Sequence, residues 1–119
     1  RERTLSLPVL SGFDEPENLQ PGFRSSDQHL LRAVTLLERI RLDYPDFYAR
    51  ISELVSAGDE YVIYTAGSTT KIYLGSTALT EKVHLLEAFR ATIDHQRSWG
   101  GYEYIDLRYA KQVIVRERT

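Results

Sequence analysis

The end of the chain, from Tyr104 to Arg116, alternates in side-chain character with a period of two residues. In the first half, Ile105, Leu107 and Tyr109 alternate with Tyr104, Asp106 and Arg108. In the second half, Val113 and Val115 alternate with Gln112, Ile114 and Arg116. A period of two is typical of β-strands. Because no later segment can pair with a final strand, its N–H and C=O groups are either covered or offered to a partner. We therefore predict a sheet that finishes on an edge strand.

Composition narrows the class of protein. The 119 residues are enough for one domain with its own core. With 15 basic and 17 acidic residues, the net charge of -2 provides no electrostatic footprint for nucleic acid or an anionic membrane, which favours protein partners. The absence of cysteine excludes disulfides, thiol catalysis and thiolate metal sites.

The sequence also has the features of a fragment. It contains no signal-peptide pattern, no methionine and no run of about 18 apolar residues, and it begins at Arg1. We expect residues 1–119 to be a single domain cut from a longer protein, whose membrane anchor or second domain is missing.

The first segment predicts a short edge strand followed by a loop. Leu5, Leu7 and Val9 alternate with polar or proline positions, and Pro8 favours a sheet edge because proline cannot donate to a ladder. Residues 11–24 are rich in glycine, proline and acidic side chains, which indicates a loop.

A helix is predicted from Ser26 to Asp43, before Pro45. Ser25 and Gln28 match a capping box at its start. The predicted buried positions are Leu30, Val34, Leu37 and Ile40, and the predicted solvated positions are Arg32, Glu38, Arg39 and Asp43.

Three strands, a second helix and the terminal hairpin follow. Arg50 to Ser56 is ambiguous, but its context favours a strand, and Glu60–Thr65 and Lys71–Leu74 form an antiparallel meander with it. The next apolar positions recur at helical spacing: Leu79, Val83, Leu86 and Ile93, with Leu85 and Phe89 widening the stripe. A hairpin or bent strand from Tyr102 completes the sheet. The expected fold is α+β, a mostly antiparallel twisted sheet with two helices packed on one face.

The sequence motifs give little support for a catalytic site or a metal site. His84 and His95 nearly share a helix face but lie roughly 16 Å apart at the rise of a helix, too far for one ion. Nucleophile and phosphate-loop motifs are absent. We expect no catalytic residue, no metal and no cofactor. The tyrosines of the predicted strands are expected to be half-buried with the hydroxyl at the surface: Tyr61, Tyr64, Tyr73 and Tyr104. Trp99 is either an exposed anchor or packed over the second helix.

Several blocks, in order, resemble the extracytoplasmic β domain of the bacterial cell-division protein family FtsQ, called DivIB in other bacteria. The blocks are Leu7-Pro8-Val9-Leu10-Ser11-Gly12, Ile51-Ser52-Glu53-Leu54, Tyr73-Leu74-Gly75 with Lys82, and Ile105-Asp106-Leu107-Arg108-Tyr109 with Val113 and Val115. The structural motif positions among them are Leu7, Pro8, Gly12, Gly75, Lys82, Asp106 and Arg108. The family's cytoplasmic tail, membrane span and POTRA domain are not in this chain.

The resemblance implies a non-enzymatic scaffold in the inner or cytoplasmic membrane, with this domain on the periplasmic or extracytoplasmic side at the division septum. It implies that the domain binds the bitopic proteins FtsB (DivIC in other bacteria) and FtsL and helps to regulate the septal peptidoglycan synthase. Partner contact in the family is made by the last strand through β-addition. The implied partner-binding residues are Tyr109, Lys111, Gln112, Val113, Ile114, Val115 and Arg116, although Lys111, Gln112 and Arg116 differ from other members.

Other interpretations stay open. Lys111, Arg116 and Arg118 could be charges that blunt an edge strand against aggregation. Asp106 and Arg108 could form a surface ion pair or pin the hairpin. An alternative class is a small ligand-binding or enzymatic α+β domain that uses the crevice between sheet and helices. A further alternative is a structural module whose binding lies in the missing portion.

Overall fold

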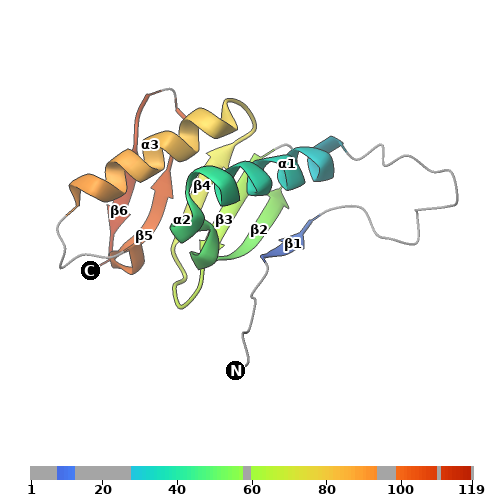
Figure 1. Cartoon of the computed structure of the whole chain (residues 1–119). Coiled ribbons are helices and arrows are strands. Elements are labelled where there is room, and N and C mark those ends of the chain that lie inside the picture. Colours follow the sequence, from blue (N-terminus) through green and yellow to red (C-terminus); the bar gives the residue numbers. More distant parts are fainter. Residues whose placement is uncertain (1–7, 13–27, 58–59, 94–98, 110, 119) are drawn as a thin grey trace, which may run out of the picture.

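A six-stranded sheet with helices on one face forms the fold (Figure 1). The computed structural model describes residues 8–12, 28–57, 60–93, 99–109 and 111–118. The strands are β1 (Val9–Ser11), β2 (Ile51–Ala57), β3 (Glu60–Thr65), β4 (Lys71–Gly75), β5 (Tyr102–Asp106) and β6 (Ile114–Glu117). The helices are α1 (Gln28–Asp43), α2 (Pro45–Arg50) and α3 (Leu79–Thr92), with a 3-10 helix η2 (Trp99–Gly101).

The spatial order of the strands follows their order in the chain, from β1 to β6. Three neighbouring pairs are antiparallel: β2 with β3, β3 with β4, and β5 with β6. The pairs β1–β2 and β4–β5 are parallel, and each is joined by a connection that contains a helix, as parallel pairing requires. The predicted α+β class and the predicted meander are confirmed, and β1 and β6 lie at the two edges.

The core lies between the sheet and the helices. Ile63, Ile72 and Ile105 are paired across β3, β4 and β5 and are fully buried. The helices cover this row with two sets of buried side chains, Ala33, Leu36, Leu37 and Ile40 from α1, and Val83 and Leu86 from α3. Figure 1 shows α1 and α3 on the same face of the sheet, as predicted.

The buried face of α1 differs from the predicted one at two positions, because Leu30 is half-buried and Val34 is exposed. Leu37 and Ile40 are buried, but Val34 is 50% exposed, so its assignment to the core was wrong. Ala33, Leu36, Leu37 and Ile40 follow the spacing of one helical face, and Val34 lies beside that face. The predicted capping box at Ser25 lies outside the described residues.

The helix α2 was not predicted. Tyr44 leaves helical geometry at φ −137 and ψ 68, and Pro45 then occupies the first turn of α2. Proline is tolerated there because its missing N–H would have no helical partner anyway. The new helix buries Phe47, and β2 starts directly after it. The proline therefore starts a second helix, although it was interpreted only as the end of the first.

The strand tyrosines divide between the two faces of the sheet. Tyr61 is fully buried on the helix face and its hydroxyl donates to the carbonyl oxygen of His29 over 2.7 Å, so the prediction that it is half-buried was wrong. Tyr64, Tyr73 and Tyr104 are half-buried, as predicted. Tyr73 pairs with Val62 and with Asp106 in the neighbouring strands, on the face opposite to the helices.

The final strand pattern is interrupted in the structure. The strand predicted from Tyr104 to Tyr109 ends at Asp106, and the last strand begins at Ile114, later than predicted. Between them Leu107 donates its N–H to the carbonyl oxygen of Tyr73 over 2.8 Å, and Lys111 adopts a positive φ of 58°. The alternation itself is confirmed, because Val113 and Val115 pack against the core, whereas Gln112, Ile114 and Arg116 are exposed.

Candidate functional site

The strand β6 is hydrogen-bonded to β5 on one side only. Ile105 pairs with Val115 and Asp106 pairs with Ile114. Among the strands that the structure describes, none lies on the other side of β6. An edge of this kind is a template on which a further strand can be added.

The direction of the backbone groups on this edge follows from one hydrogen bond beyond the strand. Arg118 donates its N–H to the carbonyl oxygen of Gly101 over 3.0 Å. Because successive residues of a strand direct their N–H groups to opposite sides, Arg116 and Ile114 also donate toward β5. The N–H group of Val115 therefore points outward, where a partner strand would lie.

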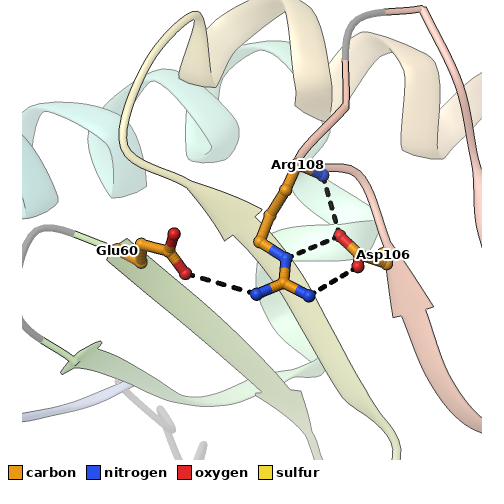
Figure 2. Close-up of polar contacts among 3 residues, drawn as sticks. All are labelled: Glu60, Asp106 and Arg108. Atoms are coloured by element: carbon orange, nitrogen blue, oxygen red, sulfur yellow. Dashed lines mark hydrogen bonds and ion pairs between the residues drawn. The ribbon is translucent and has the colours of Figure 1, made fainter.

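The turn that leads from β5 toward β6 is organised by Asp106 and Arg108. One carboxylate oxygen of Asp106 accepts the backbone N–H of Arg108 and its Nε, each over 2.9 Å, and the other accepts Nη2 over 2.7 Å (Figure 2). Asp106 is buried, while Arg108 remains partly exposed. Charge-assisted, bidentate pairs of this type fix geometry more strongly than single neutral hydrogen bonds. The prediction that the pair could pin the hairpin therefore has a structural basis.

The guanidinium of Arg108 also extends across the sheet. Its Nη1 lies 3.5 Å from Oε1 of Glu60 on β3 (Figure 2). Its central carbon lies 4.7 Å from the centre of the Tyr73 ring on β4. The sequence did not single out Glu60 or Tyr73 for this site. They lie 48 and 35 residues before Arg108, and only the register of the sheet brings the three together.

Three motif positions of the sequence meet behind this turn. Gly75 has φ +80°, and a Cβ added to it would lie 3.0 Å from Nζ of Lys82 and 3.4 Å from Cγ of Arg108. Lys82 is buried on α3. Gly75, Lys82 and Arg108 therefore occupy one crowded position, where a larger residue than glycine would displace a charged side chain.

Charges around Asp106 set its protonation. Burial alone would raise the pKa of its carboxyl, but the hydrogen bonds from the side chain and backbone of Arg108, with the charges of Arg108 and Lys82, outweigh burial and lower this pKa below its usual range. The hydrogen bond to Asp106 raises the pKa of Arg108. Both groups are therefore charged across the physiological range.

The connection from Arg108 to β6 exposes an aromatic side chain. Tyr109 is 54% exposed, and its carbonyl oxygen accepts the N–H of Gln112 over 3.2 Å. Ile114 is 40% exposed on the face opposite to the helices. Of the predicted partner-binding residues, Tyr109, Lys111, Gln112 and Val113 precede the last strand and Ile114, Val115 and Arg116 lie on it.

The first motif block lies at the opposite edge of the sheet. Gly12, directly after β1, has φ +82°, and a Cβ there would lie 2.1 Å from the carbonyl oxygen of Ser56 on β2. Only glycine fits this approach. Leu7 lies outside the described residues, and so do His95 and the side chain of Trp99. The motif positions therefore lie at two separate places in the fold, Gly12 beside β2 and Gly75, Lys82 and Arg108 beside the turn after β5.

An open groove runs between α1 and the start of α3, with a volume of about 1010 Å³. Its exposed apolar lining comes from Leu31, Val34 and Leu42. It lies between two helices and not in the crevice between helices and sheet that the ligand-binding alternative requires. The described residues contain no helix that is both long and apolar enough to cross a membrane.

The fold and the site define an α+β domain that presents an open edge strand beside a pinned turn. The family model described as cell division protein FtsQ/DivIB, C-terminal, matches residues 1–108. The chain therefore belongs to the FtsQ/DivIB C-terminal family, whose members are membrane-anchored scaffolds of cell division. No curated protein matches the chain. The match to the family model ends at Arg108, before β6 begins.

Proposed function

We propose that this domain is a non-enzymatic scaffold of the divisome that binds FtsB/DivIC-like and FtsL-like bitopic proteins through β6. In this proposal the domain lies on the extracytoplasmic side of the membrane, anchored by a segment outside this chain. Binding there would help to recruit and regulate septal peptidoglycan synthesis.

The observation that carries the proposal is the open outer edge of β6. Val115 directs its N–H group outward, so an added strand would gain main-chain hydrogen bonding along this edge. Exposed Ile114 and Arg116 would supply side-chain contacts on one face of the extended sheet.

The turn before β6 supports the same role. Tyr109 is a large amphipathic side chain with two rotatable χ angles, and an exposed tyrosine of this kind loses little entropy when a partner covers it. The Asp106–Arg108 pair fixes the start of the connection that carries Tyr109. An ordered connection lowers the entropic cost of binding.

The test is a titration of the domain with the soluble extracytoplasmic region of an FtsB/DivIC-like protein from the same organism, followed by NMR amide shifts. Saturable shifts concentrated between residues 109 and 117 support strand addition at β6. Shifts centred on the groove between α1 and α3 would move the interface to another surface. A folded domain whose amides do not shift at high partner concentration would contradict the proposal for this chain.

A further inference from the structure

The strand β6 is short and sits at an edge, so its ends need support. It spans Ile114–Glu117 and pairs only with β5 among the described residues. Edge strands and chain ends with few buried contacts open at low free-energy cost, and an opened strand must be ordered again before it can bind. Any contact that holds β6 closed therefore favours strand addition.

Arg118, immediately after β6, makes such contacts in three directions. Its N–H donates to the carbonyl oxygen of Gly101 over 3.0 Å. Its guanidinium donates through Nε to the carbonyl oxygen of Gly100 over 2.8 Å and through Nη2 to Oγ1 of Thr69 over 2.7 Å. One residue thus ties the end of β6 to η2 and to the connection between β3 and β4.

The connection that receives Arg118 is itself held in place. Ser68 donates its hydroxyl to Oγ1 of Thr70 over 2.8 Å and accepts the N–H of Thr70 over 3.0 Å. The hydroxyl of Thr70, which is fully buried, donates to the carbonyl oxygen of Tyr102 at the start of β5 over 2.7 Å. Thr69 lies between these two residues, so Arg118 is bonded to a connection that is hydrogen-bonded on both sides of its acceptor.

The contacts of Arg118 distinguish between two roles for its positive charge, blunting the sheet edge and holding β6 in place. A cation that blunts an edge would direct its charge past the outer side of the strand. The guanidinium of Arg118 instead bonds groups on β5's side of the molecule, at η2 and at the β3–β4 connection. The turn of Asp106 and Arg108 holds the other end of the β5–β6 unit.

We infer that Arg118 is a positioning residue for partner recognition, which keeps β6 closed on β5 so that the outer edge is ready to accept a strand. This inference rests on the proposed function. It concerns a residue beyond the part of the chain that the family model matches.

The first test uses Arg118→Ala, Arg118→Lys and Thr69→Val, with Arg90→Ala as the matched control. Arg90 is an exposed arginine of α3 that is ion-paired with Glu87 of the same helix, so its replacement removes an arginine outside the contacts of Arg118 with Gly100, Gly101 and Thr69, which we call the clamp. Hydrogen exchange of the Ile114 and Arg116 amides, which point toward β5, should accelerate about tenfold in Arg118→Ala and less in Thr69→Val, which loses one of the two side-chain bonds. Lysine in Arg118→Lys keeps the charge but has no planar guanidinium to bond Gly100 and Thr69 at the same time. Its exchange rates should therefore resemble those of Arg118→Ala.

The second test measures binding of the soluble partner region from the titration above. Arg118→Ala should bind more weakly, by at most the roughly tenfold increase in opening, while its global unfolding midpoint stays at the wild-type value. A double variant, Gly101→Cys with Arg118→Cys, provides a rescue, since the chain has no other cysteine and Gly101 has no positive φ. The reduced form should bind weakly, and the oxidised form should recover wild-type affinity because the disulfide replaces the clamp.

The outcomes separate the two proposals. Wild-type exchange rates at Ile114 and Arg116 in Arg118→Ala would overturn the clamp whether or not a partner binds. Faster exchange with unchanged partner affinity would show that Arg118 supports β6 but does not position it for recognition, which also overturns the inference. A wild-type domain that fails to bind the partner would contradict the proposed function, while the exchange measurement would still decide the clamp.

Discussion

The carboxylate of Asp106 accepts both the main chain and the side chain of Arg108, two residues later. The hydrogen bond from the main chain closes a tight turn. The hydrogen bonds from the side chain orient the guanidinium across β4, toward Glu60 on β3. The two roles can be separated, because an asparagine keeps an oxygen for the N–H but loses the charge.

Replacing Asp106 by Asn should therefore weaken folding without opening the turn. The charged pair is lost while the backbone hydrogen bond stays, and we expect about 1 to 2 kcal/mol less free energy of unfolding in urea. Asp43→Asn removes an exposed ion pair with Arg39 and should cost no more than about 0.5 kcal/mol. Equal effects of the two substitutions would mean that burial of Asp106 adds nothing to its pair.

The contribution of Asp106 should also depend on pH. Its pKa in the folded state lies below the ordinary value of 3.8, so its stabilisation is complete above that value and disappears as the pH falls through the folded-state pKa. The difference in free energy of unfolding between wild type and Asp106→Asn should shrink as acid is added. A difference that stays constant down to the acid limit of folding would argue against the lowered pKa.

Glycine at position 12 should be required by space as well as by conformation. In Gly12→Ala the new methyl group would lie 2.1 Å from the carbonyl oxygen of Ser56, which forces β1 away from β2, and we expect a loss of more than about 2 kcal/mol. Gly67→Ala is the control, since Gly67 also has a positive φ but open space around it, and only the left-handed conformation should cost about 1 kcal/mol. Similar losses in both variants would remove the packing argument for Gly12.

The outward N–H of Val115 offers a test of strand addition. An amide-to-ester replacement at Val115, made by ligating a synthetic C-terminal segment, removes this donor and keeps the side chain that packs on the core. We expect partner binding to weaken by about 1 kcal/mol or more, with the fold retained by circular dichroism. The matched ester at Ile114 removes a donor that points toward β5 and should destabilise the hairpin instead. Unchanged affinity for the Val115 ester would place the interface elsewhere.

Tyr109 tests the side-chain part of the interface. Tyr109→Ala should weaken partner binding by about 2 kcal/mol or more if the ring is a central anchor. Because the side chain is more than half exposed in the free domain, stability should barely change. Titration calorimetry with Tyr109→Phe separates the ring from its hydroxyl. An alanine variant that binds like wild type would remove Tyr109 from the interface.

Local pattern predicted much of this fold because strand and helix periodicity depend on neighbouring residues. The alternation at Val113 and Val115 correctly predicted which side chains of the last segment pack on the core, and the apolar spacing at Val83 and Leu86 identified the buried face of α3. The pattern did not show that Pro45 starts α2, since proline ends one helix and begins another by the same restriction of φ.

The exposure of single side chains was less predictable. Val34 and Leu37 are both apolar residues of α1, yet only Leu37 faces the sheet. Tyr61 and Tyr64 lie on the same strand on opposite faces, and α1 buries Tyr61 and its hydroxyl. These differences come from which face the helices cover, and a single strand or helix does not carry that information.

The sequence by itself determined most of the strand and helix pattern and the resemblance to the FtsQ/DivIB family, because each depends on residues close together in the chain. Only the tertiary structure brought Glu60 and Tyr73 to Arg108, Lys82 to Gly75, and Arg118 to Thr69. These partners lie far apart in sequence, and the register of six strands and the crossover through α3 decide which of them meet.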